Sequence, residues 1–435
     1  MNLRVPVDLA QSRHCSPRFP HPALWRWHFH AGLFCIPFIV VLALSGSIYL
    51  FKPQIDAFAD RDVDSLATSG HRATGEAQIA AAIASLPGSK LFVYEIPREP
   101  DDAVRVHLYS PDGTGRIVYV HPETLAILKT VAHTARLTEI VKTLHGELLA
   151  GRTGSILVEL AAGWAIIMLI TGLYLWWPRE TRGAAGVLYP RFGQGRTAFW
   201  RDLHAVTGIW ISTLALFLLI TALPWTTVWG AGFKQLRQLG EPAVRQDWSA
   251  GRAAEHAEHL RDMSAATLAT PVSLDDIVRR VTALHLDPPV RVYLPSDRQP
   301  FWRVRSETQN RPRVRELELD ARTGELLREQ HFGEKPLLDR IVGIGVAAHE
   351  GQLFGAANQM LGLATALGLV AICVSAIVMW WRRRPGGTLG VPAPRVEGFR
   401  ISWPLGLTIA LLGILLPVFG ASLLLLAIST RLRTR

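Results

Sequence analysis

Five long runs of apolar residues constrain this chain more than any other feature of its sequence. They cover residues 31–51, 154–177, 204–229, 353–381 and 401–429, and Glu159 is the one charged residue inside the first four. Runs of about 20 or more apolar residues are long enough to cross a bilayer as helices. The first run is too long for the core of a signal peptide and has no convincing cleavage site, so we expect it to remain as an anchor. The pattern predicts a multi-pass membrane protein.

Composition agrees with this class and argues against nucleic-acid binding. The 435 residues are 49% hydrophobic and 19% charged, and the mean hydropathy is +0.20. These values fit a membrane protein with sizeable soluble parts. The net charge is +10, but much of the excess Lys and Arg flanks the apolar runs and does not form a patch on a soluble domain. We therefore interpret it as a topology signal.

Arginines gather on one side of the predicted spans, which favours a cytoplasmic N-terminus. They are Arg4, Arg13, Arg18 and Arg26 before the first span, Arg179, Arg182, Arg191, Arg196 and Arg201 between the second and third, and Arg382, Arg383 and Arg384 after the fourth. The C-terminal residues RLRTR then fall outside, against the rule.

The three cysteines are not expected to form disulfides. Cys35 and Cys373 lie within spans and are expected to pack as small apolar residues, and Cys15 is expected to be cytoplasmic. The two outward segments contain no cysteine, so no disulfide framework is expected there.

The expected fold is a membrane α-helical bundle, a duplicated four-helix core plus a fifth span, with two extracytoplasmic α+β domains. Each outward segment contains one helical pattern followed by alternating strands. Asp112-Gly113 marks a hairpin turn in the first, and Ser273 caps the helix of the second. The predicted layout is an N-terminal segment 1–24, spans 25–51, 145–177, 204–229, 349–381 and 401–429, outer domains 52–144 and 230–348, cytoplasmic loops 178–203 and 382–400, and a tail 430–435.

Matched spacings indicate that the chain repeats one unit of span, outer domain and span. His28 precedes Ser45-Gly46 by 17 residues, and His204 precedes Thr221-Ala222 by 17. A second set agrees. His145 and His349 each precede a Trp-Trp pair by 31 residues, and Thr171 and Ser375 each lie 26 residues after their histidine. Parallel repeats are related by a pseudo-twofold axis along the membrane normal, which places equivalent residues opposite each other.

The repeat therefore predicts two imidazole pairs, His28 with His204 near the inner face and His145 with His349 near the outer face. Facing histidines on separate helices can hold a haem iron axially. The levels would lie about 30 Å apart if roughly 20 helical residues separate them. Gly32, Gly46 and Gly208 would give a flat macrocycle room, Arg26 and Arg201 would balance propionates, and the chain has no C-x-x-C-H, so the haem would be non-covalent.

Other interpretations of these histidines are weaker. A single histidine at a membrane boundary is more often an interfacial residue than a ligand, and two histidines per face without a carboxylate or thiolate make a poor zinc site. His30 lies about 200° around the helix from His28 and cannot face the same iron. The remaining polar, aromatic and sulfur residues are expected to have structural roles. Six histidines are expected at the surface: His14, His21, His71, His107, His121 and His133. Trp176, Trp177, Trp380 and Trp381 are expected to anchor the spans at the membrane interface, and Glu159 is expected at a membrane boundary. Met168, Met360 and Met379 are expected to pack in the core, with methionine as an alternative axial ligand.

Several stretches resemble the PepSY-associated transmembrane proteins. They are WHFHAGLF with LALSGSIYLFKPQID, LHGELLAGRTG with LITGLYLWWPR, DLHAVTGIW, and the WWRRRP that ends the fourth span. The outward segments are similar to PepSY domains, whose closing strand carries a D-x-x-T-G-E type turn. Asp320, Thr323, Gly324 and Glu325 match that turn, while His121, Thr124, Leu125 and Ala126 match it loosely. The resemblance covers roughly residues 25–385.

The resemblance implies a bacterial inner-membrane protein linked to iron uptake, with PepSY domains in the periplasm. Some members are haem-containing reductases of ferric siderophores, and the family's recurrent span histidines map onto His28, His145, His204 and His349. Similar proteins often have tyrosine at the position of His30. We therefore expect two b-type haems that carry electrons across the membrane to a ferric siderophore and release Fe(II). No nucleotide-binding motif lies in the inner segments, so the donor would be a flavoprotein or a quinol.

Two other functions compete with this expectation. PepSY domains also occur in protease propeptides, so the chain is alternatively a membrane-anchored binding or peptidase-regulating protein without redox activity. A transporter is less favoured, because no span is broken in mid-membrane by paired Gly and Pro, and Pro37 and Pro224 are expected near the span ends. Bound haem discriminates the electron carrier from both. Membrane lipid is the remaining expected partner, and nucleic acid is not one.

Overall fold

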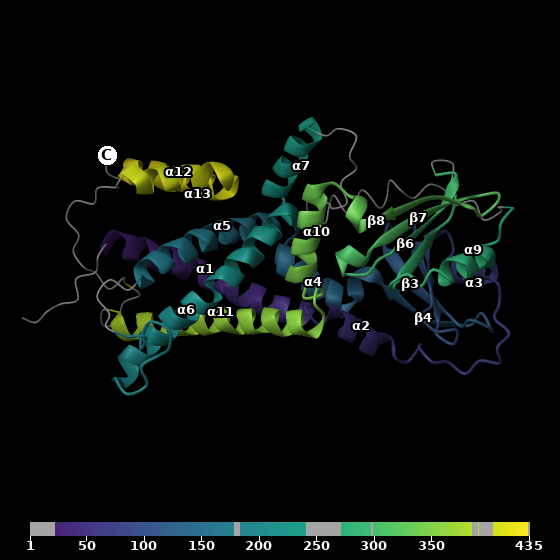
Figure 1. The fold of residues 1–435 in the computed structure, drawn as a ribbon, viewed down its shortest axis with the longest axis horizontal. Coiled ribbons are helices and arrows are strands. Elements are labelled where there is room, and N and C mark those ends of the chain that lie inside the picture. The colour runs from purple at the N-terminus through teal and green to yellow at the C-terminus, as the bar shows by residue number, and fades with distance from the viewer. Residues whose placement is uncertain are drawn as a thin grey trace, which may run out of the picture.

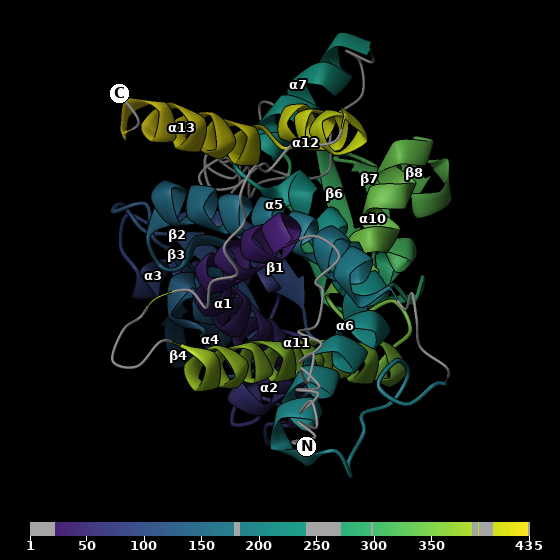
Figure 2. The same cartoon turned by 90° about the vertical axis from the view of Figure 1, so that its left-hand side faces the viewer.

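A computed structural model of the chain describes residues 22–177, 183–240, 271–296, 299–384, 390 and 403–433. Within these residues, four helices are long and apolar enough to cross a membrane. They are α1 (Pro22–Tyr49), α5 (Gly151–Trp176), α6 (Gly195–Ala222) and α11 (Ala356–Arg383). Figure 1 shows them lengthwise with the β-sheet at one end of the bundle, and Figure 2 shows the bundle from its opposite end. Arg4, Arg13, Arg18, Cys15, Arg179 and Arg182 lie outside the described residues.

The second and fourth spans begin later than the sequence predicted. His145 lies in the last turn of a separate helix, α4 (Leu137–Glu147), and His349 ends another, α10 (Leu337–His349). Leu148 and Leu149 adopt positive φ after α4, and Gly351 and Gly355 do so after α10. A left-handed residue ends a helix and redirects the chain. The two histidines therefore precede the spanning helices and do not begin them. The third span begins earlier than predicted, because α6 starts at Gly195 and His204 lies inside it.

The predicted fifth span, 401–429, is wrong as a single helix. The chain forms α12 (Trp403–Leu415) and α13 (Pro417–Arg433), separated at Leu416 (Figure 2). Pro417 has no backbone N–H and cannot continue the preceding helix. Phe419 then packs against α5, where its ring lies 5.0 Å from that of Trp164. Pro37 also differs from its prediction, because it lies inside α1 and not near the end of a span.

The two outward segments form one continuous antiparallel sheet and not two separate sheets. The strand order is β4-β3-β2-β1-β5-β6-β7-β8. The halves join at the β1–β5 pair, where Tyr94 is opposite Val292 and Glu95 is opposite Arg291. The strands are β1 (Lys90–Ile96), β2 (Val104–Tyr109), β3 (Gly115–Val120), β4 (Ile127–Ala132), β5 (Val290–Tyr293), β6 (Phe301–Ser306), β7 (Arg315–Asp320) and β8 (Leu326–His331).

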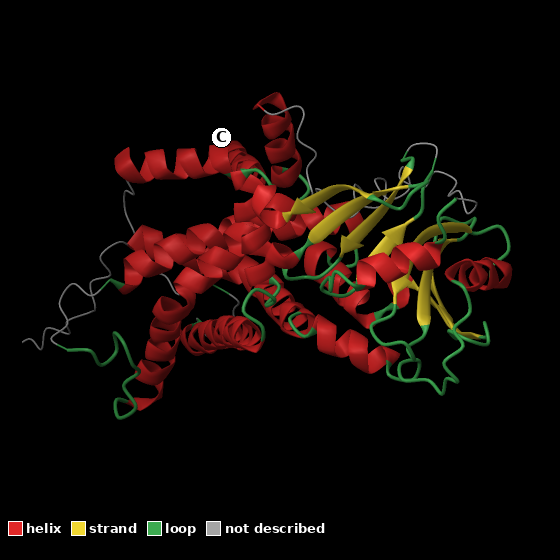
Figure 3. Ribbon diagram, turned by 45° about the vertical axis from the view of Figure 1, so that its right-hand side comes forward, coloured by secondary structure: helices red, strands yellow, loops and turns green. Residues whose placement is uncertain are grey.

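Two capped helices, α3 (Gly75–Ser85) and α9 (Leu274–Thr282), cover one face of the sheet. Side chains of alternate strand residues pack with these helices in one apolar core that includes Ile79, Ile277 and Trp302. Ser273 caps α9 as predicted by accepting from the Asp276 N–H. Figure 3 places the strands between these two helices and the helical bundle. The opposite face of the sheet therefore faces the spans.

Short helices connect the bundle to the sheet. They are α2 (Lys52–Asp60) after the first span, α7 (Trp229–Gly240) after the third, and the 3-10 turns His133–Ala135, Leu223–Trp225, Arg311–Arg313 and Phe332–Glu334. The Glu159 carboxylate, which is buried, accepts from the Val228 and Trp229 N–H groups at 2.8 and 2.9 Å and so caps the start of α7. The sequence did not predict this capping contact, and the expected position of Glu159 at a membrane boundary stays a prediction. Cys35 and Cys373 are buried inside the bundle, as expected of small apolar residues.

Candidate functional site

The four histidines singled out by the repeat form two pairs. His28 on α1 and His204 on α6 have ring centroids 6.5 Å apart and ring planes at 87°. His145 on α4 and His349 on α10 have centroids 6.4 Å apart and planes at 83°. The second pair lies at the sheet end of the bundle, and we call it the sheet-proximal pair. The first is the sheet-distal pair. The two pairs have nearly the same geometry, although they come from different helices.

A hydroxyl group on a neighbouring span contacts the Nδ1 atom of each histidine. The four contacts are His28 with Thr171 at 3.0 Å, His204 with Ser375 at 3.2 Å, His145 with Ser45 at 3.1 Å and His349 with Thr221 at 2.9 Å. These hydroxyls are the same residues whose spacing revealed the repeat. Their spacing marks the repeat in the sequence, but their contact with the histidines was not predicted. Their equal spacing was the available signal.

Hydrogen bonding at each hydroxyl indicates which imidazole nitrogen carries the proton. Ser45 and Thr221 each donate to the carbonyl four residues earlier, at 2.7 and 2.8 Å. A hydroxyl that donates in this way accepts from the imidazole, so Nδ1 is the N–H donor. His204 supports the assignment, because its Nδ1 also lies 3.2 Å from the carbonyl oxygen of Ile372, which only accepts. Each Nε2 therefore keeps its lone pair for a metal.

The helices set the distance between the two levels. Ser45 lies on α1 beside the sheet-proximal His145, and His28 lies 17 residues earlier on the same helix. At 1.5 Å per residue, 17 residues correspond to about 26 Å along the helix. His204 and Thr221 repeat this spacing on α6. The levels are thus slightly closer than the sequence estimate.

One cavity of about 1920 Å³ reaches both histidine pairs and extends to the sheet. Gly32, Gly46 and Gly208 line it, as the sequence analysis predicted. A Cβ added at Gly46 would lie 3.2 Å from Cε1 of His145. Gly172, which was not predicted, lies equally close to the other level, because its added Cβ would be 3.1 Å from Cε1 of His28. Side chains at these two positions would crowd the imidazoles, so glycine keeps the space beside them open.

The separation within each pair suits two imidazoles that would hold one iron between them. Two metal–nitrogen bonds of about 2 Å each, with a ring radius of about 1.2 Å, separate the centroids by about 6.4 Å. The observed separations are 6.5 and 6.4 Å. His28 with His204, and His145 with His349, are the residues that would hold a haem, which would supply one-electron chemistry when bound. Among the described residues, no three or more His, Cys, Asp or Glu side chains lie close enough together to hold a zinc ion.

Several other predicted residues lie away from these pairs. His30 is exposed, and its Nδ1 contacts the Arg26 carbonyl at 2.7 Å. Arg26 is also exposed, whereas Arg201 lines the sheet-distal part of the cavity and pairs with the buried Asp202 at 2.9 Å. Met168 and Met379 line the cavity and Met360 is half exposed. His14 lies outside the described residues, as does His21.

The prediction that His107 is a surface residue is wrong. His107 is buried, and its Nε2 lies 3.0 Å from Oε2 of Glu95. Burial lowers the pKa of His107. Burial alone would raise the pKa of Glu95, but the hydrogen bond from His107 and the charges of Arg291 and Arg105 outweigh it and hold that pKa well below its usual range. The alternation of β2 explains the error, because one face of this strand meets the cavity and not solvent.

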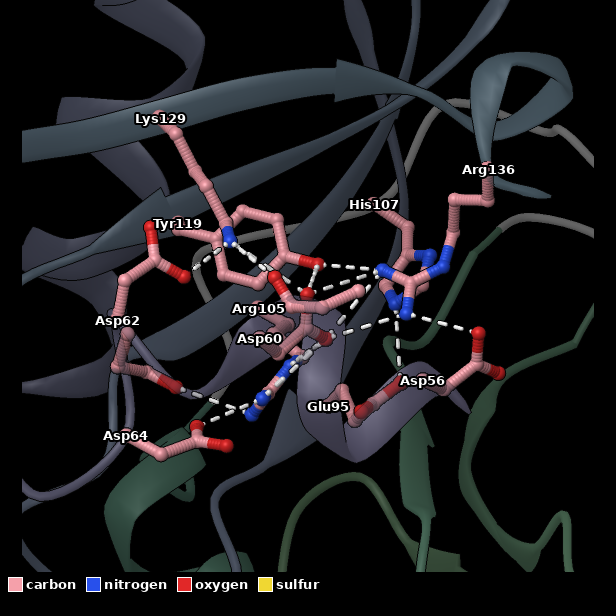
Figure 4. A network of polar contacts seen from close by, with 12 residues as sticks. Asp56, Asp60, Asp62, Asp64, Glu95, Arg105, His107, Tyr119, Lys129 and Arg136 are labelled. Carbon is pink, nitrogen blue, oxygen red and sulfur yellow. Dashed lines mark hydrogen bonds and ion pairs between the residues drawn. The ribbon is translucent and has the colours of Figure 1, made fainter. Parts of the chain in front are cut away.

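A buried ion-pair network attaches the sheet to the bundle (Figure 4). Asp60, at the end of α2, accepts from Tyr119 Oη at 2.9 Å and from Arg136 at 3.2 Å, and lies 3.5 Å from Arg105. Arg105 also binds Asp64 at 2.8 Å. Burial raises the pKa of the Tyr119 hydroxyl above its usual value. Arg136 directly precedes α4, which carries His145, so the network connects the sheet to the sheet-proximal histidine level.

Comparison with known families identifies the chain. A family model described as "PepSY-associated TM region" matches residues 25–383. The match covers all four spanning helices and both halves of the sheet. The chain therefore belongs to this family and is a multi-pass membrane protein. No curated protein matches the chain.

Proposed function

We propose that this PepSY-associated membrane protein is a two-haem reductase that passes electrons across a bacterial inner membrane to a ferric siderophore. The observation that carries the proposal is the pair of matched imidazole couples, each with centroids at bis-histidine spacing. His28 and His204 would hold one b-type haem, and His145 and His349 the other. Both haems would be non-covalent.

The histidines would bind the haems, and their hydroxyl partners would orient the imidazole rings. Haem, when bound, supplies reversible one-electron chemistry with a potential set by its ligands and surroundings. Each Nδ1 is held by a hydroxyl group on a neighbouring helix, which would leave Nε2 as the nitrogen that binds a metal. Two levels about 26 Å apart suit transfer across a hydrocarbon core of about 30 Å better than a single level does.

The substrate would enter the part of the cavity between the sheet and the sheet-proximal histidines. A ferric chelate that gains one electron there becomes a ferrous chelate. Hard oxygen donors bind Fe(II) less tightly than Fe(III), because the ion carries less charge, so Fe(II) would be released. With the sheet in the periplasm and the N-terminus in the cytoplasm, a flavoprotein or a membrane quinol would supply the electron at the sheet-distal level.

The experiment is an optical spectrum of the purified protein in detergent, dithionite-reduced minus oxidised, with haem quantified as its pyridine complex. Sharp low-spin b-type bands from about two haems per chain would support the proposal, and reduction of a ferric siderophore would then be assayed. Protein made with ample haem that still carries none would overturn it. That result would favour the other class, a membrane-anchored PepSY protein that binds a peptide or a peptidase.

A further inference from the structure

The two C-terminal helices are strongly apolar but short for crossing a bilayer. Residues 401–430 contain no charged side chain, and Arg400 and Arg431 border them. α12 has 13 residues and α13 has 17. At 1.5 Å per residue they are about 20 and 26 Å long, whereas a hydrocarbon core is about 30 Å thick. Each helix is therefore long enough to reach the middle of a bilayer from one face, but too short to reach the other face.

The turn between these helices lies beside the middle of a span. The ring of Phe419, just after the turn, packs on Trp164 near the middle of α5, and Trp164 Nε1 donates to Ser422 Oγ at 3.1 Å. A Cβ added at Gly163 would lie only 2.9 Å from the Cβ of Phe419, so glycine lets the turn approach α5 closely. Because α5 is one of the spans, the turn lies at the depth of the hydrocarbon region.

Both helices lead from this turn away from the sheet. Figure 1 shows them over α5, with the C-terminus at the end of the bundle farthest from the sheet. Figure 2, seen from that end, shows the two helices diverging from the turn. α11, which precedes them in the chain, also ends on that side, because its Ser375 contacts the sheet-distal His204. The start of α12 and the end of α13 therefore lie on the same, sheet-distal side.

The backbone at the turn is shielded and hydrogen-bonded. Leu416 is 5% exposed, and its N–H donates to the Leu412 carbonyl at 2.9 Å. The Leu415 carbonyl accepts from Trp229 Nε1 at 3.0 Å, and Pro417 has no N–H to satisfy. Irregular backbone is tolerated at membrane depth only where protein covers it and its polar groups have partners. This turn meets that condition.

Away from the turn, both helices expose large apolar side chains. Soluble proteins rarely expose contiguous apolar surfaces of this kind, whereas lipid chains would cover them. Trp403, exposed at the start of α12, is a residue type that membrane interfaces favour. The exposed leucines and isoleucines are Leu407, Leu411, Ile414 and Leu415 on α12 and Leu424, Leu425, Leu426 and Ile428 on α13.

The direction of the two helices also accounts for the charge at the end of the chain. A single span over 401–429 would place the arginines of the C-terminal RLRTR on the sheet side, against the other arginine clusters. Two helices that open toward the sheet-distal side return these arginines to the side where Arg382, Arg383 and Arg384 follow the fourth span. Basic residues near spans gather on one side of a membrane. The exception found in the sequence is thereby removed.

We propose that residues 403–433 form a re-entrant helix pair, which enters the bilayer from the sheet-distal face, turns near its middle at Leu416 and returns to the same face. Its partner is lipid, because the exposed apolar side chains contact the acyl chains of the sheet-distal leaflet. The described residues then cross the membrane four times, and the start of α1 and the end of α13 lie on one side. The inference does not depend on the reductase function, because it concerns the surface of the bundle and not the cavity.

Single cysteines would report the side on which each end of the pair lies. A membrane-impermeant maleimide is added to spheroplasts and, separately, to inverted membrane vesicles that contain the full chain. Thr430→Cys reports the end of α13, and Trp403→Cys reports the start of α12. Cys15→Ser provides the background, because the other two native cysteines are buried in the bundle.

Two further exposed positions serve as matched references. Arg382→Cys, at the end of α11, marks the sheet-distal side, and Arg279→Cys, on α9, marks the sheet side. We expect Thr430→Cys and Trp403→Cys to be labelled in the preparation that labels Arg382→Cys, and to lose labelling in the other. Labelling of Thr430→Cys together with Arg279→Cys would overturn the proposal. A protease-sensitive peptide tag fused after Arg435 gives the same comparison without any substitution.

The depth of the turn is measured separately with a nitroxide attached at Ile414→Cys, because Ile414 is 80% exposed and lies next to the turn. Oxygen is concentrated among acyl chains, whereas a water-soluble nickel chelate is excluded from them. We expect oxygen to relax this nitroxide more strongly than nickel does. Stronger relaxation by nickel would place the turn in water and overturn the proposal. Disulfide cross-linking of two chains through Ile414→Cys would assign the apolar face to a second copy and overturn the lipid contact.

Discussion

The Nδ1 atom of His349 lies 2.9 Å from the hydroxyl oxygen of Thr221, a residue 128 positions earlier on another helix. The same relationship connects His145 with Ser45, at the equivalent place in the first half. In both cases the hydroxyl comes from the span whose own histidine belongs to the other level. Each of these spans therefore contributes one ligand candidate at one end and one orienting group at the other. α1 and α6 therefore each contribute to both levels, and a change at one end of either helix should affect the level at that end.

Removing one sheet-proximal histidine should remove one haem and leave the other. His145→Ala or His349→Ala would take away one of the two proposed ligands of that haem, whereas His28 and His204 remain about 26 Å away along the helices. We expect the haem content to fall from about two to about one per chain, measured as the pyridine complex. His30→Ala is the matched control, because His30 is exposed and bonds to its own helix. Unchanged haem content in both single variants would contradict the assignment.

Loss of an orienting hydroxyl should weaken haem binding without abolishing it. Ser45→Ala leaves the Nδ1–H of His145 without its hydroxyl acceptor, and such outer partners are typically worth about 10–100-fold in affinity. We expect faster haem loss to apomyoglobin and a shifted midpoint potential for that haem only. Ser47→Ala removes a hydroxyl that donates to the Ala43 carbonyl on its own helix and should have no effect. Recovery in Ser45→Thr would distinguish the hydroxyl from simple packing.

Neutralising Asp60 should destabilise the junction between sheet and bundle. Asp60→Asn leaves Arg105, Arg136 and Lys129 with less compensating charge in a buried site, and breaking a buried pair costs about 3–5 kcal/mol. Thermal unfolding in detergent would measure the loss. Asp62→Asn removes a carboxylate whose side chain is 64% exposed and should change stability by no more than about 0.5 kcal/mol. Equal effects of the two changes would rule out the network as the cause.

Mild acid should destabilise the sheet through His107. Its pKa is lowered by burial, so at a pH just below the ordinary histidine value of 6.5 the unfolded chain binds a proton that the folded chain does not. Stability should therefore fall as the pH decreases from 6.5. Glu95, whose pKa is also lowered, adds a second loss as the pH falls below its ordinary value of 4.5, because the unfolded carboxyl then takes up a proton first.

His107→Gln provides the test of that pH dependence. Glutamine retains a donor for Glu95 but does not titrate, so the apparent melting temperature should decrease less between pH 6.5 and 5 than in the unmodified protein. Below pH 4.5 the two proteins should decrease in parallel, because Glu95 is present in both. A slope that does not change between pH 6.5 and 5 would exclude His107 as the group responsible.

The sequence alone was sufficient to predict the four spans, the strand and helix patterns outside them, and the histidine pairs. Hydropathy and alternation are local properties, and the repeated spacing from His28 to Ser45 and from His204 to Thr221 carries long-range information in one dimension. That spacing places His28 opposite His204 before any contact is known. The family resemblance seen in the same stretches is confirmed by the match over residues 25–383.

Tertiary structure decided what local patterns do not encode. The joining of β1 to β5 into one sheet depends on edge pairing between distant segments, and the burial of His107 depends on which face of that sheet meets the bundle. The position of His145 on a separate helix follows from the backbone conformations of Leu148 and Leu149, which leucine rarely adopts without tertiary constraint. Hydrogen-bond partners such as Thr221 and His349 come from residues far apart in the chain, so only the packed bundle determines them.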